Sequence, residues 1–325
     1  MHYDVFNGDA DGIIALVQLR LAQPKESVLI TGVKRDISLL KQLEGKAVDS
    51  VTVLDISLEK NVEPLKTLLA NNVDVLYVDH HRTGEIPQSA HLTTLINTDA
   101  NTCTSLLVNE LLKGQFVNWA IVAAFGDNMK QAAKKLSKQQ GLTAIEEDKL
   151  AQLGVYVNYN GYGRTVDDLH FKPDELYSLL CQYTEPLTLV NEEDSVFTTL
   201  ASAYHQDMAK AQSATVLADN SICKAVLLDD EAWARRVSGV FGNELANQSP
   251  NKAHAVLTLN TDATYTVSVR APLDNKQGAD EICIQFPTGG GRAGAAGINN
   301  LPQEMLEGFI NTMTQYYADS SSSLK

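Results

Sequence analysis

One short stretch, residues 75–82, constrains the fold of this chain more than any other. Residues 75–78 form an apolar, β-favouring run that is typical of a buried strand, and the run stops abruptly at Asp79, His80 and His81. A carboxylate and two imidazoles at a strand end cost folding free energy unless they bind something. In open parallel sheets, ligands lie just beyond the carboxyl ends of the strands. The stretch therefore predicts a parallel strand with a binding site at its end.

The same order, a strand and then a helix, repeats through the first half of the chain. Five β-favouring apolar runs are expected to form strands: 2–7, 27–31, 50–55, 73–79 and 92–97. Helices are expected over 13–21, 36–43, 57–70, 116–125, and from 101 onward. Strands that alternate with helices are typical of a doubly wound parallel sheet with helices on both faces. The predicted fold class is therefore α/β.

Carboxylates follow three of these expected strands. Asp9 and Asp11 lie in a glycine-flanked turn after the first strand, Asp55 follows the third, and Asp79 follows the fourth. Any one of them, taken alone, is as well explained as a helix cap. Carboxylates that follow three strands and meet at one edge of the sheet would repel one another unless a cation neutralised them. Together they predict a divalent-cation site, to which Asp127, after the apolar run 116–125, is either a further contributor or a helix cap.

Charge and composition limit the partners that this chain can have. The 325 residues include 26 Lys and Arg against 40 Asp and Glu, a formal net charge of −14. Such a balance opposes long-range attraction to duplex DNA or to an anionic membrane, so an anionic substrate would need local cations. The four cysteines are widely spaced, and no run reaches transmembrane length. These features predict reduced thiols and a cytoplasmic protein.

The second half of the chain changes pattern. Residues 1–190 are expected to form the first domain with a helical extension, 191–218 a helical linker, and 219–325 a smaller α/β domain. Strands are expected at 222–228, 253–260 and 264–270, with helices at 192–217, 233–247 and 303–317. Residues 287–297 contain Gly289, Gly290 and Gly291, followed by small residues. Such a glycine-rich segment is either a tight turn or a loop whose backbone N–H groups bind phosphate.

The order of these motifs resembles the DHH phosphoesterase superfamily. The resemblance rests on 8–12 (Gly-Asp-Ala-Asp-Gly), Asp55 at a strand end, the triplet 79–81, and Asp127, in the same order and spacing. It implies a centre of two Mn²⁺ ions, with Mg²⁺ as an alternative. By the same resemblance, Asp9 would bind one ion, Asp11, His80 and Asp127 the other, and Asp55 would bridge them. His81 would face the scissile phosphate, and Asp79 would support the metal site.

The second domain also resembles a domain of this superfamily. Residues 268–270 (Ser-Val-Arg) and 289–297 are similar to the substrate domain of nanoRNases and related nucleotide phosphodiesterases. The resemblance implies that Arg270, Gly289, Gly290, Gly291 and Arg292 bind the substrate. Arg292 stands where that family usually has His, and an arginine binds phosphate but does not transfer protons near neutral pH.

One position departs from the pattern of the first domain. Several superfamily members have a ligand His four residues before the first Asp of the first motif, and this chain has Val5 there. The departure leaves the first metal short of one protein ligand.

The expected activity is that of a metal-dependent phosphodiesterase. Two ions would clamp a phosphate and activate a water, and the products would be 5′-mononucleotides from short single-stranded oligonucleotides or small nucleotides. Duplex DNA and membranes are excluded as partners, and the interpretation allows a homodimer. Three alternatives stay open: a nucleotide phosphomonoesterase, a cyclic-dinucleotide phosphodiesterase, and a catalytically impaired nucleotide-binding protein.

Overall fold

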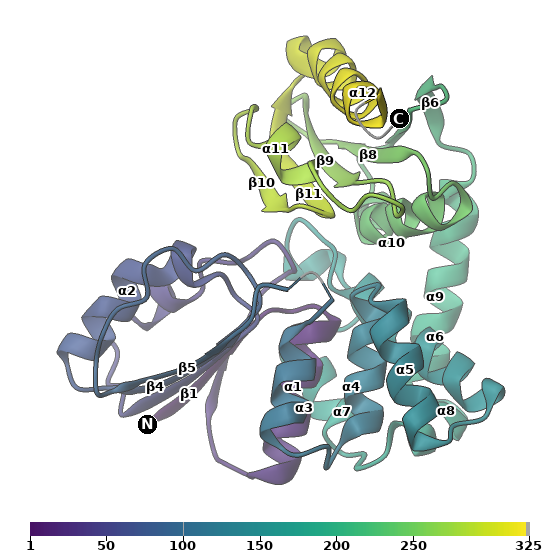
Figure 1. Cartoon of the computed structure of the whole chain (residues 1–325). Helices are drawn as coiled ribbons and strands as arrows, with labels where there is room; N and C mark the ends of the chain where they lie inside the picture. The colour runs from purple at the N-terminus through teal and green to yellow at the C-terminus, as the bar shows by residue number, and fades with distance from the viewer. Residues whose placement is uncertain (100, 323–325) are drawn as a thin grey trace. The chain divides into compact units, whose positions relative to one another are not determined.

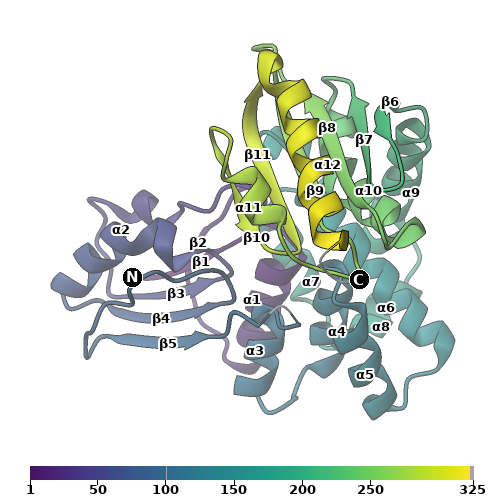
Figure 2. The same ribbon diagram turned by 45° about the horizontal axis from the view of Figure 1, so that its top comes forward.

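The structure is a computed structural model that describes residues 1–99 and 101–322, so the last three residues of the expected 219–325 domain lie outside it. The chain forms two compact units, Met1–Ala203 and Tyr204–Lys325. Each unit has its own β-sheet (Figures 1 and 2).

The first unit is built on a five-stranded, fully parallel sheet with the order β2-β1-β3-β4-β5. Its strands are β1 (His2–Phe6), β2 (Val28–Ile30), β3 (Ser50–Leu54), β4 (Asp74–Asp79) and β5 (Leu92–Ile96). Figure 2 shows them side by side. Phe6 pairs with Leu54 and Leu54 with Val78, so β1, β3 and β4 end level with one another. The residues that follow these three strands therefore meet at one edge of the sheet, as predicted.

Helices cover both faces of this sheet, which confirms the α/β prediction. Helix α2 (Leu58–Ala70) buries Leu65 against the face that carries Val5, Val53 and Tyr77. Helix α1 (Ala10–Ala22) is joined to the opposite face by Arg20, whose Nε donates to Asp4 of β1 at 2.8 Å.

Helix α1 is covered by other helices on its remaining sides. They are α3 (Thr104–Leu111), α4 (Val117–Gly126), α6 (Ala144–Asn160) and α7 (Pro173–Leu180), and outside them α5 (Lys130–Gln140) packs on α4 and α8 (Pro186–Asn191) packs on α4 and α6. Figure 1 shows α1 among them. Because α1 is enclosed, residues from Ala10 to Arg20 are buried all round, and the helix lacks a polar stripe.

Two expected helices are shorter than predicted. Between β2 and β3 only a 3₁₀ turn forms, Leu40–Leu43, because the Asp36 carboxylate turns back to accept from the Val33 N–H at 3.1 Å and caps no α-helix. The helix expected over 192–217 is α9, Val196–Ala211, and it is followed by strand β6, Thr215–Asp219. Pairing of β6 with β7 satisfies its backbone groups and overrides the weak helical pattern.

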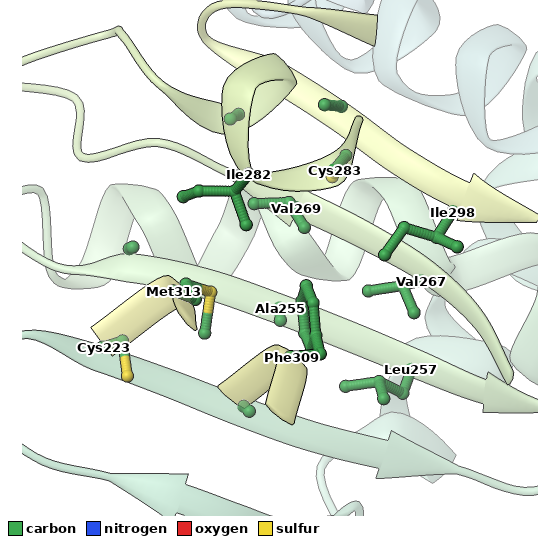
Figure 3. Packing of buried hydrophobic residues seen from close by; sticks show 14 of the residues in the cluster. Cys223, Ala255, Leu257, Val267, Val269, Ile282, Cys283, Ile298, Phe309 and Met313 are labelled. Atoms are coloured by element: carbon green, nitrogen blue, oxygen red, sulfur yellow. The ribbon is translucent and has the colours of Figure 1, made fainter. Parts of the chain in front are cut away.

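The second unit has a mixed six-stranded sheet with the order β10-β11-β9-β8-β7-β6. The remaining strands are β7 (Cys223–Leu228), β8 (Ala253–Leu259), β9 (Thr264–Arg270), β10 (Gly289–Arg292) and β11 (Ala295–Pro302). The helices are α10 (Ala232–Gln248), α11 (Ala279–Cys283) and α12 (Leu306–Ser322). Strands β8 and β9 form the expected hairpin. Figure 3 shows Phe309 and Met313 of α12 among the buried side chains of the sheet, such as Ala255 and Val269.

The glycine-rich segment is a β-hairpin and not an open loop. Strands β10 and β11 pair antiparallel, with Gly290 opposite Gly297. A Cβ on Gly289 would lie 1.7 Å from the carbonyl oxygen of Cys283, and Gly291 has a φ of +146°. Close packing and backbone conformation therefore account for Gly289 and Gly291 without a ligand. Within the described part of the chain, no helix has the length and apolar character that crossing a membrane would require.

His254 of β8 gives the second unit a pH-dependent stability. It is buried, and its Nδ1 has no hydrogen-bond partner among the described residues. Burial, with the charges of Lys224 and Lys252, lowers its pKa from 6.5 to about 4. Between pH 6.5 and 4, His254 is therefore protonated in the unfolded chain but neutral in the folded chain. The free energy of unfolding consequently falls as the pH drops through this range. The thermal unfolding midpoint should decline over this window in the intact chain, and His254→Gln should flatten the decline. An equal slope in both proteins would contradict the assignment.

Candidate metal centre

The turn between β1 and α1 directs Asp9 and Asp11 into the sheet edge. Asp9 is the N-cap of α1, and its Oδ1 accepts from the backbone N–H groups of Asp11 (3.0 Å) and Gly12 (3.1 Å). Asp11 faces the first turn of α3, where its two oxygens accept from the N–H groups of Thr104 and Ser105, each at 2.7 Å. Both side chains are buried. Asp9 therefore is a helix cap, and both aspartates also lie at the predicted edge.

Asp55 occupies a strained turn at the end of β3. Its φ is +59°, in the left-handed region that few non-glycine residues adopt. The Asp55 N–H donates to Val78 O at 3.1 Å, and Thr104 Oγ1 donates to Asp55 Oδ1 at 3.1 Å. These contacts hold the carboxylate at the sheet edge beside α3.

His80 is oriented as a metal ligand. Its Nδ1 lies 2.8 Å from the carbonyl oxygen of Thr102, and because a carbonyl only accepts, Nδ1 carries the proton. Nε2 then presents a lone pair 3.2 Å from Asp55 Oδ1 and 3.7 Å from Asp11 Oδ2. A carbonyl that fixes the tautomer of a histidine is the usual support of a metal-bound imidazole.

His81 is held by Asp79. Its Nδ1 lies 2.7 Å from Asp79 Oδ1 and 3.8 Å from Asp55 Oδ1. Asp79 is fully buried, whereas 27% of the His81 side chain is exposed. The pair thus places an oriented imidazole where the buried cluster opens to solvent.

The electrostatics of this cluster favour a bound cation. Burial, followed by the charges of Asp11, Asp9, Asp79 and Asp127, raises the pKa of Asp55 well above its ordinary value. The candidate ligand atoms of Asp55, His80 and His81 all lie within 4.8 Å of one another. Hard oxygen donors with imidazole suit Mn²⁺ or Mg²⁺. The donor set therefore fits a divalent ion, which would relieve the repulsion among the carboxylates.

Lys34 is a member of the site that sequence reasoning missed. It follows β2, and its ammonium contacts Asp9 Oδ2, Asn158 Oδ1 (3.1 Å) and Asp127 Oδ1 (3.7 Å). Burial would raise the pKa of Asp9, but the Lys34 charge, together with hydrogen bonds from Lys34 and from the Gly12 N–H, holds this pKa below its ordinary value. A signal was present, because Lys34 follows a predicted strand and so belongs to the same sheet edge as Asp9 and Asp55.

The predicted metal residues therefore divide into two groups. Asp11, Asp55, His80 and His81 meet in one group with Asp79 behind His81, and Asp9 and Asp127 meet around Lys34. Asp127 directly follows α4 as its C-cap residue. The structure thus brings all the predicted metal ligands to one edge of the sheet, with a lysine among them.

The predicted substrate residues lie in the second unit. The Arg270 guanidinium donates to Asn243 Oδ1 (2.5 Å), to Ser268 Oγ (3.0 Å) and to the carbonyl oxygens of Val269 (3.0 Å) and Gly239 (3.1 Å). Arg270 is buried by these contacts, which join β9 to α10. Gly290 and Arg292 lie in β10, with Gly290 exposed. Substrate binding by these residues stays a prediction.

Comparison with known proteins supports the resemblance. Residues 3–141 match the model of the DHH family, N-terminal domain. A search of curated protein sequences found no match.

Several solved structures share the fold along almost the whole chain. The DHH domain of PF0399, described as a member of the s1p family of ribosomal proteins, is 13% identical, with a TM-score of 0.62 over 97% of this chain and 86% of that chain. An exonuclease RecJ bound to manganese is 17% identical, with a TM-score of 0.59 over 98% and 90%. A pGpG-specific phosphodiesterase, PggH from Vibrio cholerae, is 14% identical, with a TM-score of 0.53 over 98% and 99%.

At these identities the likeness to solved structures shows the fold, and the family match adds the kind of domain. The matched residues include Asp9, Asp11, Asp55, Asp127 and the triplet 79–81. Residues 3–141 therefore match the DHH family, N-terminal domain, and together with the structural neighbours this match supports a metal-dependent hydrolase of phosphoester bonds.

Proposed function

We propose that this protein is a divalent-metal-dependent phosphodiesterase that hydrolyses short single-stranded oligonucleotides or small nucleotides to 5′-mononucleotides. The observation that carries the proposal is the convergence of Asp11, Asp55 and His80 beside an imidazole, His81, that Asp79 orients. Oxygen atoms that can bind a metal ion and an oriented imidazole that can transfer a proton are the groups that phosphoester hydrolysis requires.

Each of these residues has a distinct role. Asp11, Asp55 and His80 would hold the cation. When bound, the ion would neutralise phosphate charge and lower the pKa of a water. The Asp79 carboxylate fixes the orientation of the His81 ring. An imidazole held in this way can exchange a proton with a phosphate oxygen or with the leaving oxygen of the ester.

The substrate class follows from charge and from the structural neighbours. A net charge of −14 disfavours the binding of long nucleic acids, because their phosphates need an extended cationic surface. Among the neighbours, one is an exonuclease with manganese and another a pGpG-specific phosphodiesterase, which supports nucleotide substrates and Mn²⁺. We further propose a cytoplasmic protein, and homodimer formation stays a prediction.

The second unit is proposed to bind the substrate. We propose a catalytic domain (1–190) and a substrate domain (219–325), and the helical part of the predicted linker (191–218) is α9, because β6 already belongs to the second sheet. The exposed Gly290 and the partly exposed Arg292 of β10 offer backbone N–H groups and a guanidinium for a phosphate. Arg270, with its guanidinium engaged by Asn243 and Gly239, would act by holding β9 in place.

Hydrolysis of defined substrates tests this proposal. The metal-free full-length protein is incubated with Mn²⁺ or Mg²⁺ and with a 5′-phosphorylated dinucleotide, a short RNA, a cyclic dinucleotide and a 3′,5′-bisphosphate nucleotide. Products are separated by ion exchange, and EDTA is the control. Metal-dependent release of 5′-mononucleotides from the dinucleotide or RNA is the expected result. Release only from the cyclic or bisphosphate substrate would select one of the alternative esterases, and nucleotide binding without turnover would indicate an impaired enzyme.

A further inference from the structure

We propose that Lys34 permanently supplies one of the positive charges of this centre, so that the site binds a single divalent cation. The inference rests on the proposed function, because it concerns the same site. In this arrangement, Asp9 and Asp127 neutralise the lysine. The divalent cation is bound by Asp11, Asp55 and His80.

The surroundings of the Lys34 ammonium resemble those of a bound cation. It contacts Asp9 Oδ2, lies 3.1 Å from Asn158 Oδ1 and 3.7 Å from Asp127 Oδ1, and lies 5.4 Å from the centre of the Tyr162 ring. Its partners come from three separate segments: the turn after β1, the residue after α4, and α6 with Tyr162 two residues beyond its end. Anionic and polar oxygens thus already surround a positive charge at the first metal position of the predicted pattern.

The backbone around Lys34 is fixed, so this side chain is not a loosely held surface lysine. The Lys34 N–H donates to Gly161 O at 2.8 Å, and Asn7 Nδ2 donates to Lys34 O at 3.2 Å. Just before it, Gly32 packs so closely on Gly8 that a Cβ on Gly8 would lie 1.8 Å from Gly32 O. The fold thereby clamps the loop after β2 onto the turn that carries Asp9.

Asp9 differs from Asp11 in that one of its oxygens already contacts a positive charge. Its Oδ1 accepts from the N–H groups of Asp11 and Gly12, and its Oδ2 contacts Lys34. Val5, at the position where a further ligand would stand, is a buried side chain of the hydrophobic core with no donor atom. A divalent ion here would have to displace the ammonium or lie against it, and the two like charges would repel.

The Asp11, Asp55 and His80 group has the opposite character. Here Nε2 of His80 lies 3.2 Å from Asp55 Oδ1 and 3.7 Å from Asp11 Oδ2, so one nitrogen and two carboxylates converge on one another. This group has the oxygen and nitrogen donors that a Mn²⁺ or Mg²⁺ ion requires, so the one expected ion belongs here.

Metal content of the intact protein tests the inference directly. The full-length chain is stripped with EDTA, reloaded with Mn²⁺ and desalted, and bound manganese is measured by mass spectrometry and by electron paramagnetic resonance. We expect one ion per chain with the spectrum of an isolated Mn²⁺. Two ions per chain with an exchange-coupled spectrum would overturn the inference.

Substitution of Lys34 tests the cause. Lys34→Met keeps the length of the side chain and removes its charge, so Asp9 and Asp127 should accept a second ion and the stoichiometry should rise from one to two. Lys66→Met, which removes a charge from an exposed lysine, is the matched control and should stay at one. A Lys34→Met protein that still binds one ion would refute the role of the lysine.

A second variant covers the case in which Lys34→Met does not fold. Asp127→Asn should leave one ion bound, with its affinity lowered by no more than about 10–100-fold, because this carboxylate binds the lysine and lies outside the ligand set of the ion. Complete loss of manganese from this variant would make Asp127 a ligand and overturn the inference. Hydrolysis is scored separately: two ions with release of mononucleotides would refute only the single-ion centre, and one ion without hydrolysis would refute only the proposed activity.

Discussion

Asp55→Asn is expected to abolish metal binding and to reduce hydrolysis by about a thousandfold or more, while the chain stays folded. Asp55 is the carboxylate that approaches both His80 and His81, so its loss removes the centre of the ligand set. Charge stabilisation by a bound metal is worth several kcal/mol of the barrier, which corresponds to about this loss in rate. Manganese content and initial rates on the phosphorylated dinucleotide measure the two effects.

The metal-free Asp55→Asn protein should be at least as stable as the metal-free wild type. Asparagine tolerates the φ of +59° at this position and retains an oxygen for the hydrogen bond from Thr104. It also removes a buried charge whose pKa is raised by burial and by four neighbouring carboxylates. Asp74→Asn is the matched control. Asp74 lies at the end of β4 away from the candidate site, with 76% of its side chain exposed, so this change should leave metal content and rate unchanged. A metal-free variant that unfolds more readily would show Asp55 to be a structural residue.

Gly8→Ala is expected to destabilise the protein by about 3 kcal/mol or more and to disturb the site. The added Cβ would lie 1.8 Å from Gly32 O and 2.8 Å from Pro173 Cγ, so the backbone of two segments would have to move. Overpacking of this kind costs about 1–3 kcal/mol even where side chains can adjust, and backbone adjusts less. Denaturant unfolding of the full chain measures the free energy.

Gly308→Ala is the matched control for this substitution. Gly308 is exposed in the first turn of α12, where an added Cβ would meet no atom within 4 Å. The same change should therefore stabilise the helix, by at most about 1 kcal/mol. Equal effects of the two substitutions would show that the contact between Gly8 and Gly32 is looser than the structure indicates.

The sheet and most of the candidate metal ligands could be predicted from local pattern. Strands β1, β3 and β4 are apolar runs that end at polar residues, and parallel pairing forces their carboxyl ends to one edge. Asp9, Asp11, Asp55 and the triplet 79–81 follow these ends directly. Their convergence is therefore a consequence of strand order and needs no knowledge of long-range contacts.

Other parts depended on contacts between distant segments. Residues 215–219 are a strand because β7 pairs with them, although their own pattern favours extension of the preceding helix. Gly289 and Gly291 lie in a strand whose packing against Cys283 and Ala296 excludes side chains at these two positions, whereas the sequence is equally consistent with a phosphate-binding loop. Glycine composition alone does not distinguish a close approach of backbone from a close approach of a ligand.

By itself, the sequence determined the α/β alternation, the parallel sheet and the set of acids and imidazoles at its edge, since these follow from periodicity and strand ends. Only the tertiary structure decided how these acids are shared. It placed Lys34 between Asp9 and Asp127 and left Asp11 and Asp55 to face His80. The physical reason is that Lys34 reaches Asp9 through the packing of Gly32 on Gly8, a contact between two backbones 24 residues apart that no local pattern records.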